Sequence, residues 1–414
     1  MGDHAVRLGV GMFVGIWTAR YLGPQDFGVL SFGVALVAML GPLAALGLDT
    51  ILVRRLVQAP RTRDAAIVSA LAVKFGASLL VTLMAIVLVA LLRPDDVRAQ
   101  AIVALLAAGS LFNCLNVCDA WFAAQTRSRH IVVARNLAFL LLAAVRVALL
   151  VSSQPVQAFA AALAAETVVA GLLVLHAYRT HAGRLHFGAF SLQEARELLS
   201  DAWPLLLSGF AVILYARIDV VMLGKMRGDS EVGIYAAAVA LSEAFYFLPM
   251  ILASSTLPAI LGARQSDPAR YRARLEELYF SASWAAIILA AMLFALAPWL
   301  VNLLYGPAYR AAVAVLQIHL WALIPVFVGV VTSQYLVAEN LQMLSLARTT
   351  AGLVVNVALN LLLIPRHGAV GAAVATLISY TLATYLPIAI SRTHAHWRTV
   401  LRAPFAFGTL RRLL

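Results

Sequence analysis

The sequence predicts an all-α polytopic membrane protein with about twelve transmembrane helices, arranged as two six-helix lobes around a central cleft. Three observations predict this fold: an apolar composition, long continuous apolar runs and an internal repeat. Of the 414 residues, 63% are hydrophobic and 12% are charged, whereas soluble domains are about 45–50% apolar and about 25% charged. Because one helix needs about 20 residues to cross a bilayer, the chain has room for about 12 to 14 crossings. Unbroken runs such as Leu79–Leu92 exclude the alternating pattern of a β-barrel.

The order of the elements follows from the apolar runs between polar breaks, each of which we expect to form one membrane-crossing helix. The first run is short and lacks the amphipathic lead-in that Leu192–Leu199 gives the seventh, so we expect a shortened first helix and an incomplete N-terminus. The twelve runs cover residues 5–20, 27–48, 65–92, 99–122, 131–151, 156–178, 199–224, 231–262, 276–304, 311–337, 345–364 and 368–391.

The distribution of basic residues predicts the orientation of these helices. Of the 31 Lys and Arg residues, 21 lie on the termini and alternate loops, 7 lie on the other loops and 3 lie within the runs. Since Lys and Arg concentrate in cytoplasmic loops, both termini are expected in the cytoplasm. The net charge of +12 is therefore explained by topology and does not point to a nucleic-acid partner. Cys114 and Cys118, with no His nearby, are expected to be packing residues.

An internal repeat relates the two halves of the chain. Residues 23–28 (GPQDFG) align with residues 228–233 (GDSEVG), and residues 121–125 (WFAAQ) align with 335–339 (YLVAE). Six spans per half give parallel repeats, typical of transporters that work by alternating access. We therefore expect an N-terminal lobe at 1–178, a cytoplasmic linker at 179–198, a C-terminal lobe at 199–391 and a basic amphipathic tail on the inner leaflet at 392–414.

The sequence carries no recognisable catalytic or cofactor motif. We find no HExxH, GxSxG, GxGxxG or Asp-rich metal pattern. The loops predicted on the outer side are all short, which leaves no room for an extracytoplasmic catalytic segment. We therefore expect a protein that is not an enzyme and needs neither a cofactor nor a metal.

Several segments resemble bacterial polysaccharide-transport proteins. These are the O-antigen and exopolysaccharide repeat-unit flippases of the multidrug/oligosaccharidyl-lipid/polysaccharide exporter superfamily. The similar segments are ARYLGPQDFGVLSF (19–32), LGLDTILVR (46–54), RIDVVMLG (217–224), QYL (334–336), NVALNLLLIP (356–365) and GAVGAAVAT (368–376). They are spread over nearly the whole chain.

The resemblance implies a flippase in the bacterial cytoplasmic membrane. Its substrate would be an undecaprenyl-pyrophosphate-linked oligosaccharide, moved from the inner to the outer leaflet for surface polysaccharide biosynthesis. Its other partners would be membrane lipids and a coupling proton or sodium ion. One alternative is a cation-coupled drug or metabolite antiporter of the same superfamily. A second alternative, disfavoured by the short outer loops and the repeat, is a membrane-embedded enzyme of glycan assembly.

Charged residues within the apolar runs are the candidate functional residues, because a charge at a helix centre costs about 2.5–3.5 kcal/mol to insert. Arg146 and Arg217 each lie about 9 Å from their span centres toward the outer side. Their guanidinium groups could flank a pyrophosphate in the cleft; the alternatives are ion pairing within each lobe and snorkelling to the interface. The six charged residues are Lys74, Arg146, Glu166, Arg217, Asp219 and Glu243.

For the remaining candidate residues the expected roles are less specific. Lys74 could meet the substrate headgroup first or could snorkel along its own helix. Arg54 belongs to a basic cytoplasmic ledge that could attract the diphosphate, although the positive-inside rule also explains it. Asp219 lies about 200° around its helix from Arg217, so the two side chains face different neighbours. The candidates for the coupling ion or for charge pairing are Asp219, Glu166, Glu243 and His319. A lone His on an apolar helix is also expected as a hydrogen-bonded packing residue.

Overall fold

The computed structural model describes residues 2–251, 268–390, 397 and 400–402. The chain divides into two compact units, Met1–Gly233 (unit 1) and Ile234–Leu414 (unit 2). Within the described ranges both units are built of helices, without strands. The expected tail at 392–414 lies largely outside the described residues. The division into lobes at 179–198 stays a prediction. The helix Leu192–Met226 begins within that linker and packs on the first three helices of unit 1.

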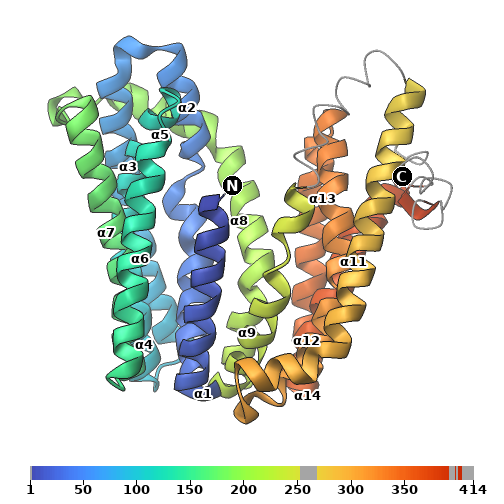
Figure 1. The fold of residues 1–414 in the computed structure, drawn as a ribbon. Coiled ribbons are helices and arrows are strands. Elements are labelled where there is room, and N and C mark those ends of the chain that lie inside the picture. The colour runs from blue at the N-terminus through green and yellow to red at the C-terminus, as the bar shows by residue number, and fades with distance from the viewer. Residues whose placement is uncertain (1, 252–267, 391–396, 398–399, 403–414) are drawn as a thin grey trace. The chain divides into compact units, whose positions relative to one another are not determined.

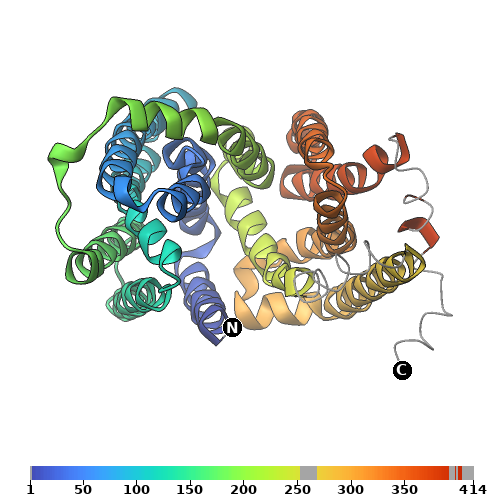
Figure 2. The ribbon, with the colours of Figure 1, turned by 90° about the horizontal axis from the view of Figure 1, so that it is seen from above.

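The helices of unit 1 lie side by side, and α1 contacts α3, α4, α6 and α8 (Figures 1 and 2). They are α1 (Gly2–Ala45), α2 (Leu48–Gln58), α3 (Arg63–Leu92), α4 (Val97–Ser110), α5 (Val117–Ala124), α6 (Arg129–Val151), α7 (Val156–Ala182) and α8 (Leu192–Met226). The helix α9 (Asp229–Glu243) begins in unit 1 and continues into unit 2. The further described helices of unit 2 are α11 (Pro268–Leu304), α12 (Ala312–Leu320), α13 (Leu323–Ala338) and α14 (Gln342–Ile390).

Ten stretches of the described residues are long and apolar enough to cross a membrane. Two of them, Gly9–Gln58 with 50 residues and Met343–Tyr385 with 43 residues, are longer than a single crossing of about 20 residues needs. Each is interrupted by a glycine with non-helical backbone angles, Gly23 (φ 70°) and Gly368 (φ 55°). Glycine tolerates this left-handed region because it has no Cβ. When each of these two stretches is counted as two, the described residues contain twelve crossings, the number predicted.

The second predicted run ends at Leu48, but the structure continues with a separate short helix. Leu46 and Gly47 have positive φ and break the chain direction, and α2 follows. The buried residues of α2 are Leu48, Ile51, Leu52 and Leu56, a spacing that places them on one face of the helix. Arg54 lies on the opposite, exposed side of α2, whereas the half-buried Arg55 lies beside the apolar residues, one turn after Ile51.

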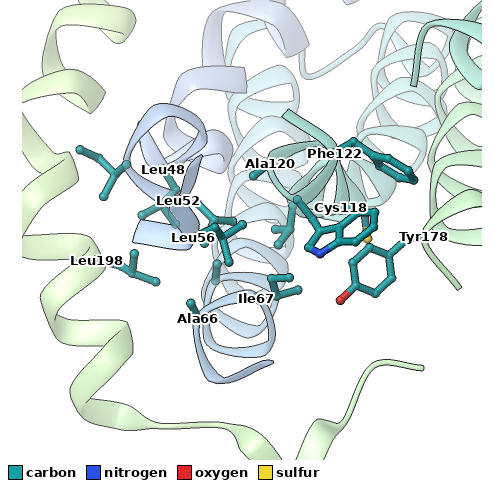
Figure 3. Close-up of a cluster of buried hydrophobic side chains, with 14 of the residues drawn as sticks. Leu48, Leu52, Leu56, Ala66, Ile67, Cys118, Ala120, Phe122, Tyr178 and Leu198 are labelled. Atoms are coloured by element: carbon teal, nitrogen blue, oxygen red, sulfur yellow. The ribbon is translucent and has the colours of Figure 1, made fainter. Parts of the chain in front are cut away.

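The apolar face of α2 packs into a core cluster shared with α3, α5, α7 and α8 (Figure 3). Leu52 is 1% exposed and Phe122 is fully buried, and Trp121 meets the Tyr178 ring edge to face at 5.6 Å. Cys118 lies within this cluster, and both Cys114 and Cys118 are buried free thiols. The cluster therefore fixes the positions from which the charged side chains of α2, α3 and α5 project.

The connections between the helices of unit 1 lie at two opposite ends, which we call the Gly23 end and the Arg55 end. The Gly23 end holds the turn at Gly23, the α3–α4 turn and the α8–α9 turn at Gly228. The Arg55 end holds the C-terminus of α2, the α5–α6 turn and the segment between α7 and α8. Successive connections along the chain therefore lie in turn at one end and then at the other.

Candidate functional site

Arg146 and Glu166 form an ion pair between α6 and α7. The Arg146 Nη2 donates to Glu166 Oε2 at 2.9 Å, and the two side chains are 12% and 22% exposed. This geometry corresponds to the pairing within one lobe that the sequence left open for Arg146. It also brings together a predicted substrate residue and a predicted coupling-ion residue.

A second arginine lies near the same pair. The Arg7 Cζ lies 5.2 Å from the centroid of the Phe139 ring, and the Arg146 Cζ lies 6.0 Å from it. A cation over an aromatic face is stabilised by the ring quadrupole. Arg7, Arg146 and Glu166 together carry a formal charge of +1. Arg7 is one of the 21 basic residues assigned from the sequence to the termini and alternate loops, so its place beside Arg146 was not predicted, although Arg7 lies inside the first apolar run at 5–20.

Lys74 on α3 is ion-paired with Asp49 on α2. The Lys74 Nζ donates to Asp49 Oδ1. The Lys74 side chain is 3% exposed, whereas the Asp49 side chain is 67% exposed. The structure thus gives Lys74 a carboxylate partner that the sequence analysis did not identify.

Another charge pair missed from the sequence joins α5 and α6. Arg135 Nη2 donates to Asp119 Oδ2 and, at 3.1 Å, to Asn116 Oδ1. The second oxygen of Asp119 and the Nε of Arg135 are buried without a hydrogen-bond partner, as is the Ser78 hydroxyl one turn from Lys74. The helix α5, which carries Asp119, contacts both α2 and α3, the helices that carry Asp49 and Lys74. Orphaned buried polar atoms of this kind are costly and mark sites where a polar ligand or water fits.

The basic ledge at the Arg55 end is neutralised in part by acidic residues of α8. Arg54 pairs with Asp201. Arg55 donates through Nε and Nη2 to the two Glu194 oxygens at 2.7 and 2.9 Å and also contacts Glu197. Arg54 and Asp201 are about half exposed. The predicted substrate residue Arg54 therefore keeps part of its surface free for an anion.

On α8, Arg217 is half-buried and Asp219 is 4% exposed. An Asp219 oxygen accepts a hydrogen bond from the backbone N–H of Val220 at 2.8 Å. The two side chains thus differ in burial, and their expected orientation toward different neighbours stays a prediction. The pyrophosphate clamp formed by Arg146 and Arg217 stays a prediction.

In unit 2, His319 is 2% exposed, and its Nδ1 lies 2.7 Å from the Ser242 hydroxyl. This is the hydrogen-bonded packing arrangement that the sequence left open for a lone His. Glu243, the next residue after Ser242, is half-buried. On α14 of the same unit, Asn360 Nδ2 donates to Asn356 Oδ1 at 2.9 Å, and both residues are fully buried. Sequence reasoning missed this neutral pair because it searched only for charges.

Across the described ranges, no group of three or more His, Cys, Asp or Glu side chains is arranged to hold a metal ion. The candidate site is therefore a set of ion pairs and unpaired polar atoms within apolar helices. Such a set can bind a charged ligand group but provides no recognisable nucleophile.

Two family models match the chain. The model of the polysaccharide biosynthesis protein family matches residues 5–262, and the MatE model matches residues 204–362. The first model spans more than half of the chain.

Two curated relatives come from Haloferax volcanii. The probable flippase AglR is 31% identical over 183 residues, which cover 42% of this chain and 37% of AglR. The probable low-salt glycan biosynthesis flippase Agl15 is 26% identical over 211 residues, which cover 50% of this chain and 43% of Agl15. The chain thus matches less than half the length of either relative.

Solved structures with the same fold cover nearly the whole chain. The inward-facing conformation of a multidrug resistance MATE family transporter has a TM-score of 0.74 at 17% identity, covering 98% of this chain and 96% of the transporter. The lipid II flippase MurJ in its inward closed conformation has a TM-score of 0.75 at 12% identity, covering 99% and 92%. At these identities the similarity establishes the fold.

Proposed function

Because the chain belongs to the polysaccharide biosynthesis protein family, whose model matches residues 5–262, we propose that it is a flippase for a lipid-linked oligosaccharide. The proposed substrate is an undecaprenyl-pyrophosphate-linked repeat unit, moved from the inner to the outer leaflet of a bacterial cytoplasmic membrane by cation-coupled alternating access. The family match carries the proposal. The partial relatives named as flippases and the fold shared with a lipid II flippase support it.

The charged residues of unit 1 suit the substrate chemically. A guanidinium presents a planar set of donors that matches phosphate oxygens. Arg7 and Arg146 lie over one aromatic ring with a single carboxylate partner, so the group keeps a positive charge for an anion. Arg217, Lys74 and Arg54 are the further proposed substrate cations. Asp219, Glu166, Glu243 and His319 are the proposed ion-coupling or charge-pairing residues.

The test is reconstitution of the purified protein with an undecaprenyl-pyrophosphate-linked oligosaccharide in proteoliposomes. We expect the wild type to translocate it and Arg146→Ala and Arg217→Ala to lose translocation while still inserting into the membrane. Arg366→Ala is the control, because Arg366 is exposed and outside the proposed site. If Arg146→Ala and Arg217→Ala both transport like the wild type, the proposed phosphate clamp is wrong.

The match of the MatE model to residues 204–362 favours a second candidate, a cation-coupled drug or metabolite antiporter. Efflux assays with cationic drugs distinguish the two functions. An antiporter would confer resistance in a drug-sensitive host and would not translocate the lipid-linked oligosaccharide.

A further inference from the structure

The two copies of the repeated six-residue segment meet each other in unit 1. Each copy begins with a glycine of positive φ, Gly23 at 70° and Gly228 at 90°. Each copy also leads directly into a helix, the second part of α1 and the start of α9. The repeat therefore preserves a backbone turn and not only a residue pattern.

The last glycine of each copy packs against the second residue of the other copy. A Cβ built on Gly28 would lie 1.8 Å from the backbone oxygen of Asp229, and a Cβ on Gly233 would lie 1.9 Å from that of Pro24. No side chain fits at either position, since real Cβ atoms do not approach oxygen so closely. The two helices thus touch backbone to backbone.

A buried arginine lies beside this contact and binds several polar groups there. Arg93, at the end of α3, is 8% exposed and donates through Nη1 to Asp229 Oδ1 at 2.5 Å and to Asp96 Oδ2 at 3.1 Å. Its Nη2 donates to the Gly224 carbonyl at 2.9 Å, and its Cζ lies 3.9 Å from the Phe32 ring centroid. We call Pro24, Gly28, Arg93, Asp96, Asp229 and Gly233 the repeat junction. It lies at the Gly23 end.

We propose that the repeat junction is a releasable latch that ties the start of α9 to the rest of unit 1, with Arg93 held by both Asp229 and Asp96 when the latch is closed and by Asp96 alone when it opens. Its role in oligosaccharide transport rests on the proposed function. The chain passes from unit 1 into unit 2 directly after Gly233, so the latch lies at the point of unit 1 from which the chain continues into unit 2.

Two features make the contact suited to opening and closing. Backbone surfaces without side chains separate without unlocking interdigitated groups. Leaving a buried arginine unpaired is strongly unfavourable, and Asp96, whose side chain is 32% exposed on the same loop as Arg93, remains as a partner after Asp229 departs. Two carboxylates for one guanidinium therefore provide a closed and an open arrangement.

The first test compares glycine substitutions. Gly28→Ala and Gly233→Ala are expected to reduce translocation in proteoliposomes at least about tenfold, because a methyl group prevents closure. Gly76→Ala is the matched control, since Gly76 is also helical and has nothing within 4 Å of its built Cβ. Wild-type translocation by Gly28→Ala and Gly233→Ala would overturn the proposal.

The second test does not depend on transport. Val232 is fully buried beside Gly233, so Val232→Cys reports opening through its labelling by a membrane-impermeant maleimide. In this background Asp229→Asn is expected to raise the labelling rate about fivefold or more, and Asp96→Asn is expected to lower it, because Arg93 then depends on Asp229 alone. A merely structural role predicts that both substitutions loosen the junction.

The labelling test can contradict the latch and the transport test can contradict the proposed function, each independently of the other. If Asp96→Asn and Asp229→Asn shift labelling in the same direction, or if neither shifts it, the latch is wrong even when the wild type moves oligosaccharide. If the opposite shifts are observed but the wild type moves no lipid-linked oligosaccharide, the latch stands and the proposed function is wrong.

Discussion

At the scale of single residues, the Lys74–Asp49 pair is unequal in burial. The ammonium group of Lys74 is 3% exposed, whereas the Asp49 carboxylate side chain is 67% exposed. Removal of the carboxylate leaves the buried ammonium group without its ion-pair partner, but removal of the lysine leaves a carboxylate already at the surface of unit 1. The two partners therefore differ in what they contribute to stability.

We expect Asp49→Asn to destabilise the protein by about 3 kcal/mol, because an unpaired buried charge is costly. Lys74→Met should be nearly neutral, since it replaces the buried ammonium with an apolar side chain of similar length. Thermal unfolding of both variants in nanodiscs measures the difference. Equal destabilisation by the two variants would contradict this account of the pair.

Arg146 and Glu166 allow a structural role to be separated from substrate binding. Arg146→Gln leaves the Glu166 carboxylate, which is 22% exposed, without its charge partner. We expect this single variant to lose about 2 kcal/mol of unfolding free energy. The double variant Arg146→Gln with Glu166→Gln removes both charges and should recover most of that loss. If Arg146 binds the diphosphate, the double variant should remain unable to translocate substrate in proteoliposomes. Full recovery of transport would assign Arg146 a structural role alone.

At the scale of elements, α2 links the core of unit 1 to the start of α8. Its apolar face packs in the cluster around Phe122, and Arg55, beside that face, pairs with carboxylates of α8. Ser69 on α3 and Ser191 reinforce this attachment through reciprocal hydrogen bonds, Ser69 Oγ to Ser191 O at 3.1 Å and Ser191 N to Ser69 Oγ at 3.0 Å. The segment that enters α8 is thus held at two places.

Removal of Arg55 should loosen the entry to α8. Glu194 is 7% exposed, so Arg55→Ala leaves a buried carboxylate unpaired and should cost about 2 kcal/mol. Trypsin should then cleave faster at Arg184, which lies in the connection between α7 and α8, and Arg55→Lys should fall between the wild type and Arg55→Ala. An unchanged cleavage rate in Arg55→Ala would show that the ion pairs do not hold this segment.

At the scale of the whole molecule, the chain consists of two units joined within α9. The spans alternate in direction, so every second connection falls on the same side of the membrane. The excess of Lys and Arg on alternate connections predicts which side is cytoplasmic. The Arg55 end should accordingly face the cytoplasm and the Gly23 end the opposite side.

Reporter fusions test this orientation. Alkaline phosphatase, which is active only outside the cytoplasm, should be inactive when fused after Arg184 and active when fused after Ser153 or Gly228. Green fluorescent protein at the same positions is the reciprocal control. The reverse pattern would contradict the predicted topology and would place Arg54 on the outer side.

The membrane spans could be predicted from sequence, because a continuous apolar run of sufficient length has few other stable structures. The run boundaries at 20–27 and 364–368 bracket the glycine breaks at Gly23 and Gly368. The charge partners could not be predicted. Asp49 lies just beyond the predicted second run, and the sequence gives no spacing rule that places it against Lys74 on another helix. Contacts between helices depend on packing, whereas periodicity defines only the face of each helix on its own axis.

The repeat junction also has a consequence in terms of symmetry. Gly28 meets Asp229 and Gly233 meets Pro24, so equivalent positions of the two copies exchange partners, as in the isologous interface of a two-fold homodimer. A single chain here carries both faces of a self-complementary surface. A substitution made at the same position of both copies therefore alters this contact at two places. A substitution in one copy alters it at one place, where the other copy is unchanged.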